Sequence, residues 1–63
     1  MRSRDVIRRL EAEGWVLNHA KGSHYQYKHH ARSGKVTVPH PRKDIPVGTL
    51  RSIYRQAGWR WGE

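Results

Sequence analysis

The chain has 63 residues, no cysteine and a formal net charge of +8, from 13 lysines and arginines against five aspartates and glutamates. A chain this short forms one domain with a small core, which excludes a pocket enclosed between two lobes, a disulfide framework and a thiolate metal site. Because it shows neither an apolar run of membrane-spanning length nor the apolar segment of a signal peptide, we expect a soluble, cytoplasmic protein that no membrane holds.

The excess of positive charge lies mainly outside the first thirteen residues. Residues 1–13 carry a surplus of one positive charge, whereas residues 14–63 carry a surplus of seven. Cations that lack internal partners typically meet an anionic partner, and nucleic acid is the leading candidate, ahead of an acidic protein or a membrane surface. The alternative is a generally basic surface without a specific partner.

The first predicted element is a helix that has Ser3 as its N-cap and ends near Gly14. Its short apolar stripe has helical spacing and consists of Val6, Ile7 and Leu10. Arg9 and Glu13 are four residues apart, so they can pair on the solvent side of this helix.

Three short antiparallel strands follow, and we expect each of them to be half buried. They cover residues 15–20, 24–28 and 35–38. For the first strand, two alternative pairs of residues are equally plausible as the inward-facing ones: Trp15 with Leu17, or Val16 with Ala20. Alternation assigns the faces of the other two: inward for Tyr25, Tyr27, Val36 and Val38, and outward for His24, Gln26, Lys28, Lys35 and Thr37.

A second helix closes the chain. Pro39 and Pro41 end the third strand, and Pro46 suits the first position of the helix. Gly58 is the predicted C-terminal cap. The buried stripe of this helix consists of Leu50, Ile53, Tyr54 and Ala57. In the tail after Gly58, the two tryptophans either fold back onto the core or mark a partner contact.

The sequence therefore predicts an α+β fold in the order helix, three strands, helix. One layer of two helices can cover only one face of a three-stranded antiparallel sheet. If the tyrosines and valines face the helices, the opposite face is open, basic and carries His24. This placement of His24 is the central inference from the residues themselves.

His24 is the main candidate for chemistry. It follows the Gly22-Ser23 turn, so its ring is expected near an edge of the sheet. Imidazole titrates near neutrality and can take a proton from a ribose 2′-hydroxyl, a step worth roughly 10²–10⁴ in rate. Neighbouring lysines are suited to hold the phosphate and stabilise its growing charge. The alternative is an exposed histidine without chemistry, which is the commoner case.

The remaining histidines do not predict a metal site. His29 and His30 are adjacent, so they point to opposite sides in an extended segment and cannot chelate together. His40 lies between two prolines and is either a phosphate contact, a second proton donor or plain loop surface.

A second basic group lies around the final helix. Arg51 and Arg55 are four residues apart on that helix, and Arg42 and Lys43 lie shortly before it. Like charges at this spacing repel unless an anion lies between them, so the group suggests a second phosphate-binding patch. A solvated helix face explains the same pattern equally well.

Three sequence blocks run through nearly the whole chain: Gly14-Trp15, then Lys21-Gly22-Ser23-His24, then Val36-Thr37-Val38-Pro39-His40-Pro41 running on through Lys43-Asp44-Ile45 to Gly48-Thr49-Leu50-Arg51-Ser52-Ile53 and Gln56-Ala57-Gly58. In order and approximate spacing they resemble the HicA family of toxin endoribonucleases. The resemblance implies a double-stranded-RNA-binding-domain-like fold, with residues 1–63 as a single toxin domain.

The resemblance also implies a function. It implies cleavage of mRNA without the ribosome, and a HicB-type antitoxin that binds the toxin and blocks its active site. The family's catalytic histidine falls on His24. Members commonly carry arginine where this chain has His19, so a phosphate contact at that position is expected to be weaker or pH-dependent.

We therefore expect a metal-independent, cofactor-free endoribonuclease that acts on single-stranded RNA, with His24 as general base and a cyclic phosphate as product. The predicted RNA contacts are Lys21, Gly22, Ser23, Lys28, Lys35, His40, Arg42, Lys43 and Arg51. His40 and Lys28 are the candidates for the conjugate acid, and Lys21, Lys28 and Lys35 for electrostatic support. Two alternatives stay open: a non-catalytic RNA-binding module of the same fold, and a basic protein-interaction module.

Overall fold

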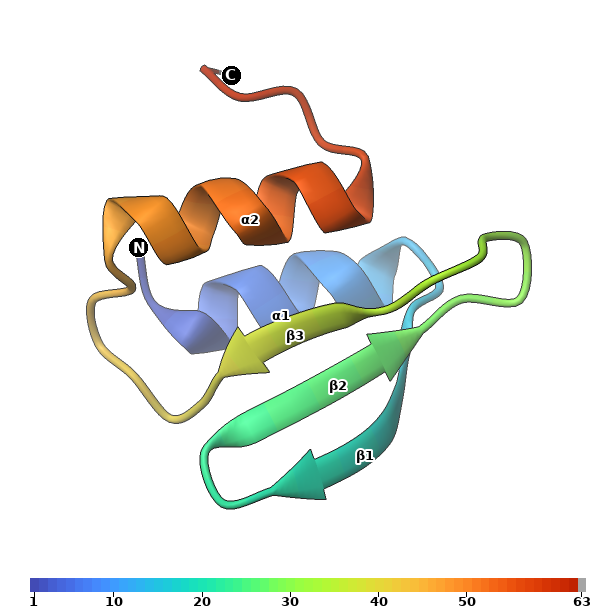
Figure 1. Cartoon of the computed structure of the whole chain (residues 1–63), viewed down its shortest axis with the longest axis horizontal. Coiled ribbons are helices and arrows are strands. Elements are labelled where there is room, and N and C mark those ends of the chain that lie inside the picture. Colours follow the sequence, from blue (N-terminus) through green and yellow to red (C-terminus); the bar gives the residue numbers. More distant parts are fainter. Residues whose placement is uncertain (63) are drawn as a thin grey trace.

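The computed structural model describes residues 1–62 and has the predicted order of elements (Figure 1). These are α1 (Ser3–Ala12), β1 (Val16–Lys21), β2 (His24–Lys28), β3 (Val36–Pro39) and α2 (Val47–Ala57). The strands form one antiparallel sheet in the order β1-β2-β3. Within the described part of the chain, neither helix is long and apolar enough to cross a membrane.

The core lies between the two helices and the inner face of β2 and β3. Its buried hydrophobic residues are Val6, Leu10, Trp15, Tyr27, Val36, Val38, Ile45, Ile53, Ala57 and Trp59. Tyr25, Leu50 and Tyr54 pack against this cluster as half-buried residues. The predicted inward face of β2 and β3 and the predicted stripe of α2 are therefore confirmed.

The first strand departs from the prediction. All six residues of β1 are exposed, so the expectation of three half-buried strands is wrong for this one. Both helices pack against β3, and Figure 1 shows β1 as the strand farthest from them. Val16 and Leu17 consequently remain 66% and 46% exposed. The strand also begins one residue later than predicted, because Trp15 turns into the core.

The helix ends also differ in detail from local expectations. Ser3 is the first residue of α1 rather than its N-cap, which is Arg2, and Ser3 is only 1% exposed. Its hydroxyl bonds to the loop before α2 instead of capping its own helix. Pro46 is the N-cap of α2 and not its first helical residue. Gly58 is the predicted C-terminal cap, with a left-handed φ of 76°.

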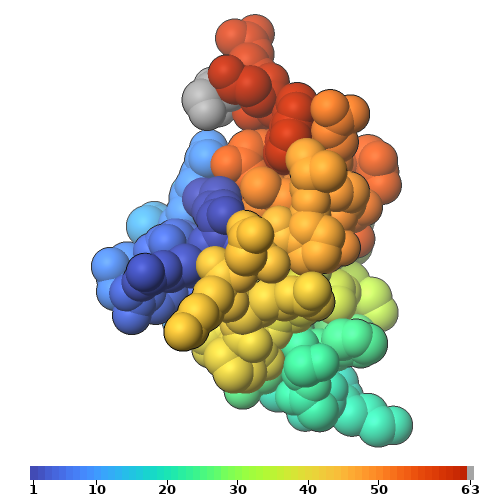
Figure 2. Space-filling view, turned by 90° about the vertical axis from the view of Figure 1, so that its left-hand side faces the viewer, coloured from blue at the N-terminus to red at the C-terminus, as the bar shows by residue number. Residues whose placement is uncertain are grey.

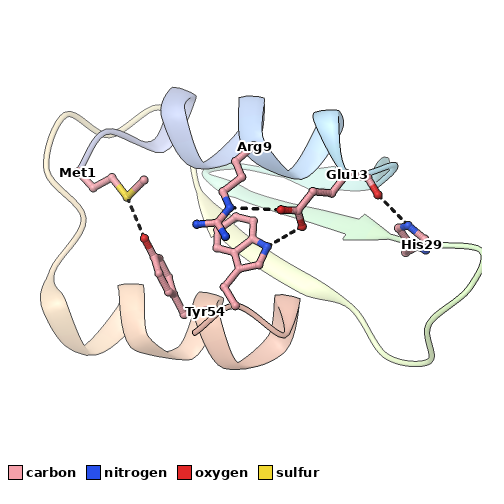
Figure 3. Close-up of polar contacts among 6 residues, drawn as sticks. Met1, Arg9, Glu13, His29 and Tyr54 are labelled. Carbon is pink, nitrogen blue, oxygen red and sulfur yellow. Dashed lines mark hydrogen bonds and ion pairs between the residues drawn. The ribbon is translucent and has the colours of Figure 1, made fainter. Parts of the chain in front are cut away.

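The segment after α2 folds back onto the end of α1. The Trp59 indole Nε1 donates a hydrogen bond of 2.7 Å to Glu13 Oε1. The other carboxylate oxygen of Glu13 accepts a hydrogen bond of 3.3 Å from Arg9 Nε, which is the predicted ion pair (Figure 3). The Arg9 guanidinium also lies 4.1 Å from the centre of the Trp59 ring. Trp59 thus belongs to the core, while Trp61 stays 42% exposed.

Candidate functional site

His24 opens β2 at the end of the sheet, and its side chain is exposed. It pairs with Lys21 of β1 and with Pro39 of β3. Beyond Pro39 the pairing continues, because the backbone N–H of His40 donates a hydrogen bond of 2.8 Å to the carbonyl of Ser23. Ordered backbone on both sides therefore fixes the position from which the imidazole projects.

Beside His24 lies a groove, which we call the His24 groove. It is lined by His24, Thr37, Pro39, Arg42, Thr49, Ser52 and Gln56. Thr37 and Pro39 share the outer face of the sheet with His24, since the alternate residues of β3 face the core. The three lining residues from α2 are spaced by three and four, so they lie on one side of that helix. The groove is formed where the outer sheet face meets the polar side of α2.

Gln56 joins α2 to the free edge of β3. Its Oε1 accepts a hydrogen bond of 3.1 Å from the backbone N–H of Thr37. Because the carbonyl oxygen makes this bond, the amide NH₂ group of Gln56 remains available as a double donor. Ser52, one turn earlier, donates its own hydroxyl proton to the Gly48 carbonyl at 3.3 Å. α2 thus both protects the sheet edge and supplies neutral polar groups to the groove.

The charge of the groove favours an anionic ligand. Arg42 contributes a guanidinium to the lining, and none of the described residues that line the groove is a carboxylate. Guanidinium, amide and hydroxyl groups can all donate hydrogen bonds to phosphate oxygens. The imidazole of His24 adds a group that can accept or release a proton. These donors together with the imidazole suit a phosphodiester that has an ionisable hydroxyl group next to it.

The predicted lysines divide between the two ends of the sheet. Lys21 lies opposite His24 in the strand register, and Gly22 and Ser23 form the turn between them. Lys28 lies four residues further along β2, about 13 Å away. Lys35 directly precedes β3 and lies at that same far end. The structure therefore does not bring Lys28 and Lys35 to His24, and a different cation, Arg42, lines the groove.

His40 lies next to the groove but does not line it. Its Nδ1 is 2.7 Å from the Ser3 hydroxyl, and its ring meets that of Tyr25 edge-on with centroids 5.0 Å apart. The Ser3 hydroxyl also accepts a hydrogen bond of 2.8 Å from the backbone N–H of Arg42. Ser3 thereby ties the loop that carries Arg42 to α1. Neither His40 nor Lys28, the two candidate acids, stands in the groove.

Arg51 lies on a different side of α2 from the groove. Its guanidinium is 5.1 Å from the centre of the Trp61 ring. Arg42 lines the groove, whereas neither Arg51 nor Arg55 does, and the second phosphate-binding patch stays a prediction. Lys43 follows Arg42 in the loop and is exposed.

His29 has a structural role. Its Nε2 donates a hydrogen bond of 2.9 Å to the Glu13 carbonyl (Figure 3), and its Nδ1 accepts one of 3.0 Å from the backbone N–H of Ala31. With both ring nitrogens engaged, His29 links the end of α1 to the loop after β2. The ring of His30 stacks on it at 4.7 Å. Across residues 1–62, no three metal-binding side chains gather closely enough to hold an ion.

Sequence reasoning missed the contribution of α2 to the groove. Thr49, Ser52 and Gln56 were not among the predicted contacts, although their spacing places them on one helical face. They also fall within the blocks that carry the family resemblance. The polar stripe that these residues form beside the buried stripe of α2 was the sequence signal that could have identified them.

Comparison with known proteins identifies the family. A family described as the HicA toxin of bacterial toxin-antitoxin systems matches residues 3–59. The chain belongs to the HicA toxin family. One solved structure, described as "HicA3 and HicB3 toxin-antitoxin complex", contains a chain 35% identical to this HicA chain, with a TM-score of 0.71. The match covers 98% of this chain and 100% of that one. Among curated proteins, none matches.

The HicA match confirms the predicted fold class. The α-β-β-β-α order, with a three-stranded antiparallel sheet and two helices, is the double-stranded-RNA-binding-domain-like architecture of HicA toxins. In this HicA chain the Gly22-Ser23-His24 segment forms the turn and first residue of β2, directly at the groove.

Proposed function

We propose that this HicA toxin is an endoribonuclease that cleaves mRNA in the His24 groove. The observation that carries the proposal is the exposed imidazole of His24 in a groove that also contains Arg42 and three polar side chains of α2. Within the described part of the chain, no carboxylate lines this groove. Such a lining attracts a phosphodiester and offers a base beside it. The net charge of +8 attracts an RNA chain to this small surface.

In the proposed reaction His24 is the general base. One ring nitrogen takes the proton of a ribose 2′-hydroxyl, and the 2′-oxygen attacks the adjacent phosphorus. The bond from phosphorus to the 5′-oxygen then breaks, that oxygen takes a proton from water to become a hydroxyl, and the protonated His24 returns its proton to the solvent. The products are a 2′,3′-cyclic phosphate and a 5′-hydroxyl. General base catalysis of this kind contributes about 10²–10⁴ in rate.

The other groups of the groove act on the phosphate. Arg42 can donate two parallel hydrogen bonds to the non-bridging oxygens, and the Gln56 amide can donate to the same oxygens. Negative charge on these oxygens grows during the attack, so donors fixed in place stabilise the transition state more than the substrate. Loop 40–46 and α2 hold these donors, which is why their packing matters for the chemistry.

The other predicted RNA contacts extend beyond the groove. Lys21 lies at the same end of the sheet as His24, while Lys28 and Lys35 lie at the far end of the outer face. In this proposal the three lysines bind parts of the RNA backbone that lie at a distance from the scissile phosphate. Their substitution should weaken RNA binding and reduce its salt dependence without removing the base.

We also propose that a HicB-type antitoxin binds this chain and covers the groove. The similar solved HicA structure is a complex with HicB3. A basic surface of this kind fits an acidic partner, and a partner over the groove would exclude RNA. Addition of the cognate antitoxin should therefore abolish cleavage at equimolar concentration, and cleavage that persists in the assembled complex would contradict this part.

The nuclease proposal is tested with purified protein and RNA in the presence of a chelator. Wild type should cut the RNA, and His24→Ala should lose about two to four orders of magnitude in rate. His30→Ala is the matched control, because His30 is exposed on the loop beyond the far end of β2, away from the groove. Equal cutting by wild type and His24→Ala would overturn the role of His24, and tight binding without cutting would favour a non-catalytic RNA-binding module.

A further inference from the structure

A second cavity lies beside the His24 groove, and we call it the arginine cavity. It is lined by Arg2, Ser3, Arg4, His40, Pro41, Arg42 and Lys43. Its volume is about 430 Å³, which falls within the range of about 300–1,000 Å³ typical of small-ligand pockets. The residues come from the start of α1 and from the loop before α2, two segments far apart in the sequence.

Figure 2 shows these segments on one face of the molecule. The loop between β3 and α2, in yellow, lies between the N-terminal segment, in blue, and the turn between β1 and β2, in green. Two backbone hydrogen bonds hold the loop against the N-terminal segment: from the Ser3 N–H to the Arg42 carbonyl at 2.9 Å, and from the Ile45 N–H to the Met1 carbonyl at 3.0 Å. The cavity is therefore part of the ordered fold.

The cavity concentrates positive charge that the protein does not neutralise. Its lining contains Arg2, Arg4, Arg42 and Lys43, and no carboxylate from residues 1–62. Asp44, the one carboxylate of the loop, pairs with the Met1 amino group at 3.4 Å. The other ion pair among residues 1–62 joins Arg9 to Glu13, so none of the four cations is paired within the described chain. Four unpaired cations around one cavity repel each other unless an anion lies among them.

We propose that the arginine cavity binds a phosphate of the RNA backbone at a nucleotide away from the scissile bond. The inference rests on the proposed function, because the RNA in the His24 groove supplies that phosphate. Arg42 lines both cavities, so the two sites are directly adjacent. His24 pairs with Pro39, and residues 39–42 lead from the groove into the cavity. An RNA strand can thus continue from one site into the other.

Continuity with the His24 groove favours phosphate over the carboxylates of an acidic protein. Three of the four cations that line the cavity are arginines, whose planar guanidinium groups bind phosphate or carboxylate with two parallel hydrogen bonds. The neighbouring groove decides between these two anions, because Arg42 lines both sites. The same continuity assigns the phosphate to the RNA strand that the groove holds.

The test compares two double variants in a His24→Ala background, in which RNA stays intact. Arg2→Gln/Arg4→Gln removes two charges from the arginine cavity. Arg8→Gln/Arg60→Gln is the matched control, because it removes two charges from exposed residues that line neither cavity. Fluorescence anisotropy then measures affinity for unstructured RNAs that lengthen one nucleotide at a time from a dinucleotide. Thermal unfolding confirms that both variants fold.

The control protein should show a step in affinity at the length that first reaches the arginine cavity. Arg2→Gln/Arg4→Gln should lack this step, and its affinity for longer RNA should be roughly tenfold below the control, as expected for loss of a hydrogen bond to a charged group. The slope of log affinity against log salt should also fall by about 0.7 for each phosphate that the variant no longer binds. Arg2→Lys/Arg4→Lys should restore the salt slope, since it restores the charges.

The result that overturns the proposal is the same length dependence and salt slope in both double variants. Loss of antitoxin binding in Arg2→Gln/Arg4→Gln with unchanged RNA affinity would also overturn it, and would assign the cavity to a protein partner. The assay does not depend on cleavage. A length step with RNA that wild type never cuts would therefore refute the nuclease proposal and keep the phosphate site, whereas cleavage without a length step would refute the phosphate site alone.

Discussion

Replacement of Ser3 by alanine should destabilise the protein far more than its position near the N-terminus suggests. Ser3 is 1% exposed, and its hydroxyl contacts His40 Nδ1 at 2.7 Å and the backbone N–H of Arg42 at 2.8 Å. Removing it leaves a partly buried N–H without an acceptor, which costs about 1–3 kcal/mol. The half-buried imidazole can turn to water, so it adds little, and we expect a total of about 2 kcal/mol.

This loss is large for so small a domain. A chain of 63 residues has a free energy of unfolding of roughly 3–9 kcal/mol. A loss of about 2 kcal/mol should lower the Tm by roughly 8–16 °C, at about 4–8 °C per kcal/mol for domains of this size. The same change removes one of the hydrogen bonds that hold the loop carrying Arg42, so RNA affinity should fall as well.

Far-UV circular dichroism during heating measures this effect directly. Ser33→Ala is the matched control, because Ser33 is exposed in the loop between β2 and β3. The Tm of Ser33→Ala should stay close to that of wild type. If Ser3→Ala melts at the same temperature as Ser33→Ala, the reasoning about the hydrogen bonds from α1 to the loop is refuted.

Three further predictions test the groove, the end of α2 and the core. Gln56→Glu keeps the acceptor for the Thr37 N–H but places a carboxylate in the groove. It should therefore weaken RNA binding about tenfold, while the Tm changes by only a few degrees. Titration of labelled RNA measures the affinity, and an unchanged affinity would count against the groove as the RNA site. Gly58→Ala places a side chain on a residue with a left-handed φ of 76° and directs it toward the Arg32 guanidinium. It should lower the free energy of unfolding, measured by chemical denaturation, by about 1 kcal/mol. An unfolding free energy equal to that of wild type would contradict this. Burial of the Tyr27 phenol raises its pKa above the usual 10.0, with a smaller contribution from the Glu11 carboxylate. The resulting stability is present below pH 10 and is lost as the pH rises above 10 through the higher folded-state pKa. Tyr27→Phe should therefore lose less stability than wild type above pH 10, and identical pH profiles would show that Tyr27 does not control this transition.

Local sequence patterns predicted the faces of β2 and β3, where the alternation of apolar and polar residues leaves only one possible orientation. Alternation in β2 and β3 placed two tyrosines and two valines inward and His24 outward, because only one face of these strands meets the helices. The same reasoning could not orient β1. Both of its possible inward sets are apolar, and its exposure depends on how far the two helices reach across the sheet.

The site required contacts between distant segments that local patterns do not contain. Serine is a residue type that commonly caps helices, yet the Ser3 hydroxyl accepts a hydrogen bond from the Arg42 backbone, almost forty residues later in the sequence. The His24 groove exists because α2 lies along the edge of β3, where Gln56 bonds to Thr37. Strand pairing, rather than composition, places Lys35 at the far end of the sheet from His24. The position of His24 on the outer face was therefore predictable, but the α2 residues that line the groove with it were not.

The central claim is that the groove uses a ribose 2′-hydroxyl as the nucleophile, with His24 as its base. The most direct test is an RNA that carries a single 2′-deoxy substitution at a mapped cleavage position, with the fragment ends identified by mass spectrometry. Wild type should leave 2′,3′-cyclic phosphate and 5′-hydroxyl ends on the unmodified RNA and should not cut at the deoxy position. Cutting at that position, or fragments with 5′-phosphate ends, would contradict the mechanism.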